Sequence, residues 1–302
     1  MAVCSSLNPG QAPALMTATL MDRIASAVRD RHPLLMGVVN VTPDSFSDGG
    51  RFERPETAIA HALQLHQQGA DILDIGGEST RPGAQPVGEQ DELDRVIPVI
   101  EGIRAATDVP ISIDTSKPGV MLAAVRAGAD MINDVNALRA PQAIRVAADL
   151  AVPVCLMHMQ GEPRTMQKDP RYGRVVDDIM AFFSARVRAC LAAGLPAERI
   201  VLDPGFGFGK TLGHNLELLA GLERIGRSGH PVLVGLSRKS MLGAITGREQ
   251  PDQRVAASVA AALLAAQRGT AIIRVHDVAE TADALAVWRA VRNLESSEGK
   301  AQ

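Results

Sequence analysis

Three polar residues follow short apolar runs, where a parallel strand would deliver them into the interior of a fold. Asp114 follows ISI, Asn133 follows MI and Asp203 follows IVL. A buried carboxylate is unfavourable unless N–H donors surround it. Two carboxylates and an amide therefore predict a site for a flat ligand whose edge is rich in N–H groups, such as a 2-amino-4-oxo-pyrimidine ring. The alternative is a structural network in which Asp114 or Asp203 pairs with Lys239.

A second set of polar residues suits an anion. Asn40 ends the first apolar run, Arg81 lies beyond the second, and Arg274 and His276 end the last. A guanidinium group matches phosphate oxygens, and Mg²⁺ bound to phosphates also accepts neutral amide oxygens. These residues predict a diphosphate site, with Asn40 as a ligand of Mg²⁺.

Two further motifs follow apolar runs. DPGFGFGKT at 203–211 is not a phosphate-binding P-loop, because Pro204 stands where that motif needs glycine. Its glycines predict a bent loop that presents Phe206 and Phe208, one of which could stack on a flat ligand, with core packing as the alternative. SRKSMLG at 237–243 places Lys239 and Ser240 at the start of a helix, where Ser240 and free backbone N–H groups could bind a carboxylate.

These residues need elements that bring them to one place. Eight short apolar runs alternate with amphipathic helical patterns along the chain. Several helical patterns end on glycine just before the next run, as at Gly69, Gly128 and Gly269. Eight such units predict a (β/α)₈ TIM barrel with its active site at the C-terminal face of the strands. A doubly wound open sheet is the alternative, but no dinucleotide-binding fingerprint is present.

The barrel is expected to occupy residues 31–295 as one domain. Residues 1–30 are rich in Ser, Pro and Ala and then weakly helical, which predicts a partly flexible extension, and residues 296–302 form a tail. The first apolar run, residues 34–39, leads into a long polar segment that predicts an active-site loop, because ordinary connections in such folds are shorter.

Composition excludes several classes of function. The net charge of −3 argues against a nucleic-acid surface or a polybasic membrane patch. No apolar run approaches the ~18 residues of a membrane span. The three cysteines, Cys4, Cys155 and Cys190, form no CxxC pair, so neither zinc nor a disulfide framework is expected and a cytoplasmic location fits.

Taken together, the motifs resemble those of bacterial dihydropteroate synthases. The resemblance runs from about Leu34 to the last helix, in the family's order, and rests on NVTPDSFSDGG, DIGGESTRPGA, ISIDTSKPGV, INDV, CLMHMQGEPRTMQ, LDPGFGFGKT, GLSRKSMLG and RVHDVAET. It implies that the chain joins (7,8-dihydropterin-6-yl)methyl diphosphate to 4-aminobenzoate, giving 7,8-dihydropteroate and diphosphate in folate biosynthesis. It also implies a homodimer and a pocket in which sulfonamides compete.

The residues show no nucleophile of the Ser–His–Asp or Cys–His kind. The resemblance assigns residues to three subsites. The pterin subsite comprises Asp114, Asn133, Met157, Asp203 and Lys239. The diphosphate and Mg²⁺ subsite comprises Asn40, Thr80, Arg81, Arg274 and His276, with Asn40 on the metal. The aminobenzoate subsite comprises Phe46, Thr80, Arg81, Pro82, Phe208, Lys239 and Ser240. The catalytic set is expected to be Asn40, Asp114, Asp203, Lys239, Arg274 and His276.

The expected reaction is a dissociative, SN1-like loss of diphosphate assisted by Mg²⁺, followed by attack of the arylamine. Two other functions remain open. A barrel like the methyltetrahydrofolate-binding domains of corrinoid methyltransferases would use a related pterin pocket, but it would need no diphosphate clamp of Arg81, Arg274 and His276. A non-catalytic paralogue would bind pterins as a regulator or scaffold.

Overall fold

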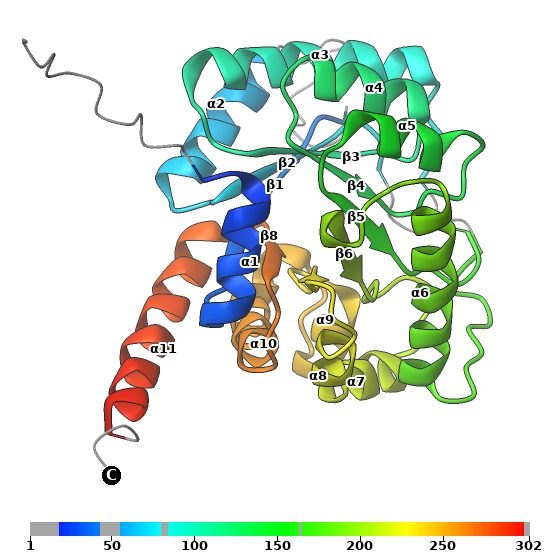
Figure 1. The fold of residues 1–302 in the computed structure, drawn as a ribbon. Helices are drawn as coiled ribbons and strands as arrows, with labels where there is room; N and C mark the ends of the chain where they lie inside the picture. Colours follow the sequence, from blue (N-terminus) through cyan, green and yellow to red (C-terminus); the bar gives the residue numbers. More distant parts are fainter. Residues whose placement is uncertain (1–17, 43–54, 80–83, 163–164, 299–302) are drawn as a thin grey trace, which may run out of the picture.

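Eight parallel strands form a nearly closed barrel surrounded by helices in the computed structural model, which describes residues 18–42, 55–79, 84–162 and 165–298 (Figure 1). The strands are β1 Leu34–Asn40, β2 Ile72–Gly76, β3 Ile111–Asp114, β4 Met131–Asp134, β5 Val154–Met157, β6 Ile200–Asp203, β7 Leu233–Val234 and β8 Ile272–Val275. The α-helices are α1 Leu20–Asp30, α2 Pro55–Gln67, α3 Glu89–Ala106, α4 Pro118–Arg126, α5 Ala143–Leu150, α6 Val175–Ala192, α7 Leu212–Ala220, α8 Leu222–Gly226, α9 Ser240–Thr246, α10 Val255–Gln267 and α11 Val278–Glu298. Two 3₁₀ turns, Ala197–Arg199 and Pro251–Arg254, precede β6 and α10.

The order of the strands decides between the two folds that the sequence allowed. The order is β6-β5-β4-β3-β2-β1-β8-β7, with all pairs parallel, so the first and last strands are neighbours. The remaining gap, between β6 and β7, is crossed by a single parallel bridge between Leu202 and Val232. The predicted TIM barrel is confirmed, and the doubly wound sheet is excluded. β7 is shorter than the apolar run that predicted it.

Successive residues of each strand face opposite sides of the barrel wall, and this alternation divides the core into two parts. One set of residues, including Leu73, Ile113 and Leu202, packs outward in the large core shared with the helices. The other set, including Met36 and Met131, forms a separate apolar cluster inside the barrel. The same alternation determines which polar side chains face the interior at the C-terminal end of the strands.

Helix α1 covers the N-terminal end of the barrel, beside β1 and β8 (Figure 1). Thr19 begins the helix with a capping box, in which its hydroxyl accepts from the N–H of Asp22 and the Asp22 carboxylate accepts from the N–H of Thr19. Leu20 and Ile24 are buried against the inner cluster. The weakly helical part of the predicted extension is a helix over residues 20–30, because it has an apolar face that packs against the inner cluster; residues 1–17 of the extension lie outside the described part of the chain.

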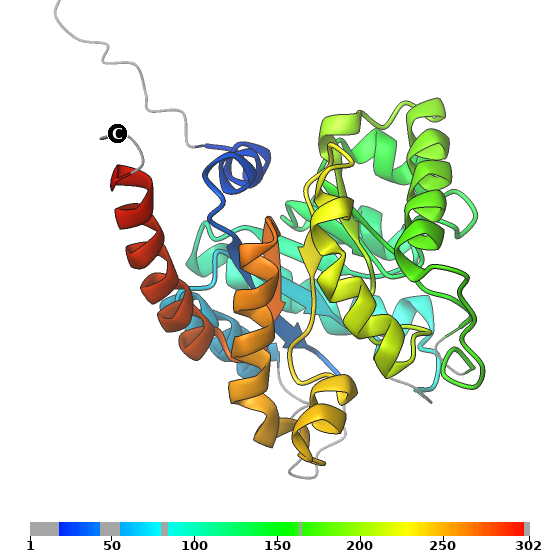
Figure 2. The same ribbon diagram turned by 90° about the horizontal axis from the view of Figure 1, so that it is seen from below.

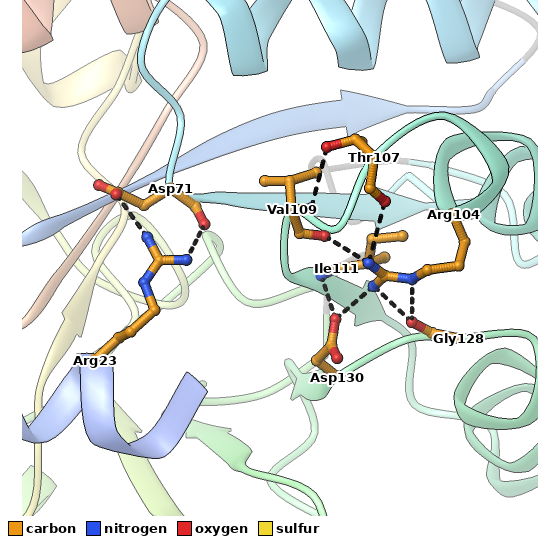
Figure 3. Close-up of polar contacts among 8 residues, drawn as sticks. All are labelled: Arg23, Asp71, Arg104, Thr107, Val109, Ile111, Gly128 and Asp130. Atoms are coloured by element: carbon orange, nitrogen blue, oxygen red, sulfur yellow. Dashed lines mark hydrogen bonds and ion pairs between the residues drawn. The ribbon is translucent and has the colours of Figure 1, made fainter. Parts of the chain in front are cut away.

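Polar contacts tie this end of the barrel together (Figure 3). Arg23 of α1 donates to the carboxylate of Asp71, just before β2, at 2.8 Å. Arg104 of α3 donates to the carboxylate of Asp130, just before β4, at 2.6 Å. The same Asp130 oxygen accepts from the N–H of Ile111 at 2.8 Å. These contacts join helices to strand starts, as expected where a barrel face serves stability rather than catalysis.

Helix α11 also differs from its predicted extent. The sequence pattern predicted that the barrel domain ends at 295 and that a tail begins at 296, but α11 continues to Glu298. Helices α10 and α11 lie side by side on the outside of the barrel (Figure 2). Among the described residues, none of the helices has both the length and the apolar character that crossing a membrane requires.

The packing of α1 predicts the effect of truncating Ile24. Ile24→Ala should lower the free energy of unfolding by about 2–5 kcal/mol, because it leaves a cavity in the closed end of the barrel. The matched control is Val28→Ala on the exposed side of the same helix, which should change it by less than about 0.5 kcal/mol. Urea titrations followed by circular dichroism measure both values. Equal effects of the two substitutions would contradict the packing role of α1.

Candidate active site

A partly buried arginine lies between two carboxylates inside the C-terminal half of the barrel. Arg274 of β8 donates through Nε to Asp74 Oδ2 of β2 at 2.6 Å, and through a terminal nitrogen to Asp114 Oδ2 of β3 at 2.9 Å. Asp74 is fully buried. Such a pair of ion pairs is stable inside a protein only because both signs are present and hydrogen-bonded.

The amide of Asn133 extends this network to β4. Its Nδ2 donates to the same Asp74 oxygen at 3.2 Å. Asn133 is level with Asp114 in the register of β3 and β4, and Asp114 is level with Gly76 at the end of β2. Three of the residues that the sequence singled out, Asp114, Asn133 and Arg274, therefore share one network with Asp74, although Arg274 was expected in the diphosphate subsite.

Asp203 ends β6, and Lys239 follows β7. The Asp203 carboxylate accepts from the N–H of Gly205 at 2.8 Å and is nearly fully buried. Burial raises the pKa of Asp203, against the opposing effect of Lys239 and other cations. Burial lowers the pKa of Lys239 to about 8, while the Asp203 carboxylate favours its charged form. Two oppositely charged groups with such shifted pKa values are typical of a functional site.

An apolar wall lies next to Asp203. Met157 is level with Asp203 in the register of β5 and β6, and it packs with Met159 and Met166, with Phe208 against them. The Lys239 ammonium lies 4.2 Å from the centre of the Phe208 ring. Of the two phenyl rings in the glycine loop, Phe208 is thus at the site.

Phe206 points elsewhere. It is fully buried and belongs to the core between the strands and helices. For this ring the alternative of core packing is confirmed.

The rim of the barrel carries the residues expected at the anion. Asn40 ends β1 level with Gly76, and its side chain is partly exposed. His276 follows β8, and its ring Nδ1 lies 3.0 Å from the hydroxyl of Ser237 after β7. Ser240 is exposed at the first position of the short helix α9, directly after Lys239. The structure places all of these groups at the C-terminal end of the strands.

A cavity of about 680 Å³ opens beside this cluster. Asp114 lies in its wall, with Val135 and Met159 as apolar neighbours and Glu78 and Arg139 as polar ones. Glu78 is held by Lys117, which also pairs with the buried Glu92. The volume of the cavity fits a bicyclic ring with room for a substituent.

Four residues assigned from the sequence lie outside the described part of the chain. They are Phe46, Thr80, Arg81 and Pro82. Their assignments to the diphosphate and aminobenzoate subsites stay predictions.

Sequence reasoning missed Asp74. It stands inside β2, between the outward-facing Leu73 and Ile75, rather than after the strand where polar residues were sought. The signal was a carboxylate in the middle of an apolar run, which only an internal cation can balance. The structure also adds to what was expected of Arg274, because its guanidinium contacts the carboxylates of Asp74 and Asp114, next to the predicted pterin subsite.

Comparison with known proteins identifies the family of the chain. The model of the family described as pterin binding enzyme matches residues 36–276. The dihydropteroate synthase of Haemophilus influenzae is 51% identical over 261 residues, covering 86% of this chain and 94% of that protein. The chain belongs to the dihydropteroate synthases.

Solved structures of this family are similar throughout the barrel. A Xanthomonas albilineans dihydropteroate synthase with 4-aminobenzoic acid is 58% identical, with a TM-score of 0.83, and the match covers 86% of this chain and 93% of that one. A Yersinia pestis dihydropteroate synthase in complex with a sulfonamide drug is 50% identical, with a TM-score of 0.83, covering 87% and 95% of the two chains.

The electrostatics of Asp114 predict how pterin binding depends on pH. Burial raises the pKa of Asp114 to about 7, although Arg274 opposes the shift. If the ionised carboxylate binds N–H donors of the ring, the affinity for a pterin should fall about tenfold per pH unit below this pKa and level off above it. Calorimetric titrations across this range measure the effect. Asp114→Asn should remove the dependence, and a wild-type affinity that does not change with pH would contradict the role of Asp114.

Proposed function

We propose that the chain condenses (7,8-dihydropterin-6-yl)methyl diphosphate with 4-aminobenzoate to give 7,8-dihydropteroate and diphosphate, as a step of folate biosynthesis. The observation that carries this proposal is the meeting of Asp114, Asn133 and Asp203 with Lys239 inside one rim of the barrel. A carboxylate can accept two adjacent N–H groups of a pterin, which a neutral apolar pocket cannot do.

The pterin ring is proposed to lie between Asp203 and Asn133, with Met157 against its face. The buried carboxylates Asp114 and Asp203 favour the developing positive charge on the ring as diphosphate leaves. In this step the bond between the methylene carbon and the diphosphate oxygen breaks, and its electron pair leaves with diphosphate.

The arylamine then forms the new carbon–nitrogen bond and loses a proton. Its nitrogen is uncharged near neutral pH, so the attack needs no strong base. Phe208 and Lys239 are proposed to hold the ring and the carboxylate of 4-aminobenzoate, and their mutual distance of 4.2 Å places a flat apolar surface beside a cation. Complexes of similar synthases with 4-aminobenzoic acid and with a sulfonamide support this part of the proposal.

The diphosphate is proposed to bind at Asn40, Thr80, Arg81, Arg274 and His276 together with Mg²⁺. Within the described residues, no group of three or more His, Cys, Asp or Glu side chains could hold a metal ion. The amide oxygen of Asn40 nevertheless fits Mg²⁺, which takes few protein ligands when it also binds phosphate oxygens and water. When bound, Mg²⁺ would neutralise charge on the leaving diphosphate.

The decisive test is release of diphosphate by the purified chain. Release should require both the dihydropterin diphosphate and 4-aminobenzoate, and an excess of a metal chelator should abolish it. Asp203→Asn should lower pterin affinity by at least about tenfold, since a charged hydrogen bond contributes ~1.5–3 kcal/mol. The matched control is Asp169→Asn, an exposed carboxylate, which should behave as wild type.

The results also separate the other two functions. Pterin binding without diphosphate release would favour a non-catalytic paralogue. Methyl transfer to a corrinoid partner would favour the methyltransferase-like barrel. Unchanged pterin affinity in Asp203→Asn would contradict the assigned pocket.

The proposal includes a cytoplasmic homodimer. Free, buried thiols at Cys155 and Cys190 suit a reducing compartment. The outer side of α11 exposes Val287, Val291 and Leu294, at 67%, 53% and 66%, spaced four and three residues apart. An apolar stripe of this kind suits contact with a second copy of the chain.

Charge placed on this stripe should weaken the dimer. Val291→Asp is expected to raise the dissociation constant by at least about tenfold, or ~1.4 kcal/mol, because a carboxylate would be desolvated in the interface. Light scattering over a dilution series measures the mass. The matched control is Leu191→Asp on α6, which also replaces an exposed apolar residue. A wild-type chain that is monomeric at all concentrations, or equal behaviour of both variants, would contradict the interface.

A further inference from the structure

The glycine loop that carries Phe208 lies directly against the backbone that follows β5. Gly205, Gly207 and Gly209 all have positive φ, at 68°, 80° and 62°. A Cβ atom added at Gly205 would lie 1.9 Å from the carbonyl oxygen of His158, and one at Gly209 would lie 2.3 Å from that of Gln160. Only glycine permits this approach, so the two loops are packed backbone to backbone.

This packing gathers carbonyl oxygens around one buried ammonium group. Lys210 is 3% exposed. Its Nζ lies 2.8 Å from the carbonyl oxygen of Gly205, 3.0 Å from that of Phe208 and 3.1 Å from Nδ1 of His158. Three donors of an ammonium thus meet three acceptors, which offsets the cost of burying the charge.

The pKa values of His158 and Lys210 agree with a hydrogen bond from the Lys210 ammonium to Nδ1 of His158. Burial and the neighbouring Lys210 lower the pKa of His158 to about 3, so its ring is neutral near pH 7 and Nδ1 can accept. Burial lowers the pKa of Lys210 to about 7, and the Asp203 carboxylate favours its charged form. Lys210 lies under the loop and is covered by it.

The position of the Phe208 ring depends on this loop. The Phe208 N–H donates to Gly205 at 3.1 Å, and its carbonyl oxygen accepts from Lys210. A second anchor is Tyr172, whose hydroxyl donates to the carbonyl oxygen of Gly209 at 2.8 Å. The ring is then held between Lys239 and the methionine cluster around Met157.

We propose that Lys210 is a positioning residue for the arylamine substrate. Its ammonium group hydrogen-bonds both to the loop at 205–209 and to His158 after β5, and in this way it holds the Phe208 ring against Lys239. The inference rests on the proposed function, because it takes Phe208 as part of the aminobenzoate subsite. Within the described residues, Asp114 of β3 and Asn133 of β4 form no hydrogen bond with this loop, and of the pterin subsite Asp203 accepts from its Gly205 N–H. Pterin binding should therefore depend less on Lys210 than arylamine binding does.

The test is a comparison of Michaelis constants for the two substrates. Lys210→Met keeps the length of the side chain and removes its donors. It is expected to raise KM for 4-aminobenzoate by about tenfold or more and KM for the pterin diphosphate by less than about threefold. The matched control is Lys168→Met, an exposed lysine in the segment between β5 and α6, which should leave both constants unchanged.

A milder variant keeps the test decisive if Lys210→Met does not fold. Tyr172→Phe removes one hydrogen bond to the same loop and retains the ring, so it should show the same selective rise at about threefold. A folded Lys210→Met with wild-type KM for 4-aminobenzoate, or with both constants raised equally, would overturn the inference. If Lys210→Met is unfolded, a selective rise in Tyr172→Phe supports the inference and its absence overturns it. Failure of the proposed function is distinct, because wild type would then release no diphosphate.

Discussion

The site depends on the arginine that β8 places between the carboxylates of β2 and β3. Arg274 bonds to both Asp74 and Asp114, which offsets the cost of placing two carboxylates close together inside the barrel. Because β8 and β2 lie on either side of β1, and β3 lies beside β2, the ion pairs form only when the last strand has joined the first three. Folding and assembly of the ligand site are therefore one event.

The barrel uses its two ends differently. At the N-terminal end, α1 covers an interior of Met36, Ile72 and similar side chains, and the contacts of Arg23 and Arg104 lie around it. At the C-terminal end, the same inward-facing positions become charged. The apolar end stabilises the ring that holds the charged end together, and this division lets the polar groups stay partly unsatisfied until a ligand binds.

Loops add a second level of positioning above the strands. The glycine loop after β6 approaches the backbone after β5 so closely that side chains are excluded, and Lys210 occupies the resulting group of carbonyl oxygens. This arrangement explains how a glycine-rich segment, which is flexible in an unfolded chain, can hold an aromatic ring in one place.

The amino-acid sequence alone determined the repeating strand–helix pattern, the barrel and most of the residues at its rim, because apolar periodicity and polar strand ends are local properties of the chain. It did not reveal that Asp74 inside β2 faces inward, that α1 closes the barrel, or that Lys210 serves the loop and Phe206 the core. Those outcomes depend on which side of the wall a residue faces and on partners distant in sequence. Only the tertiary structure decides them, because strands far apart in sequence must pair before a buried charge acquires its counter-charge.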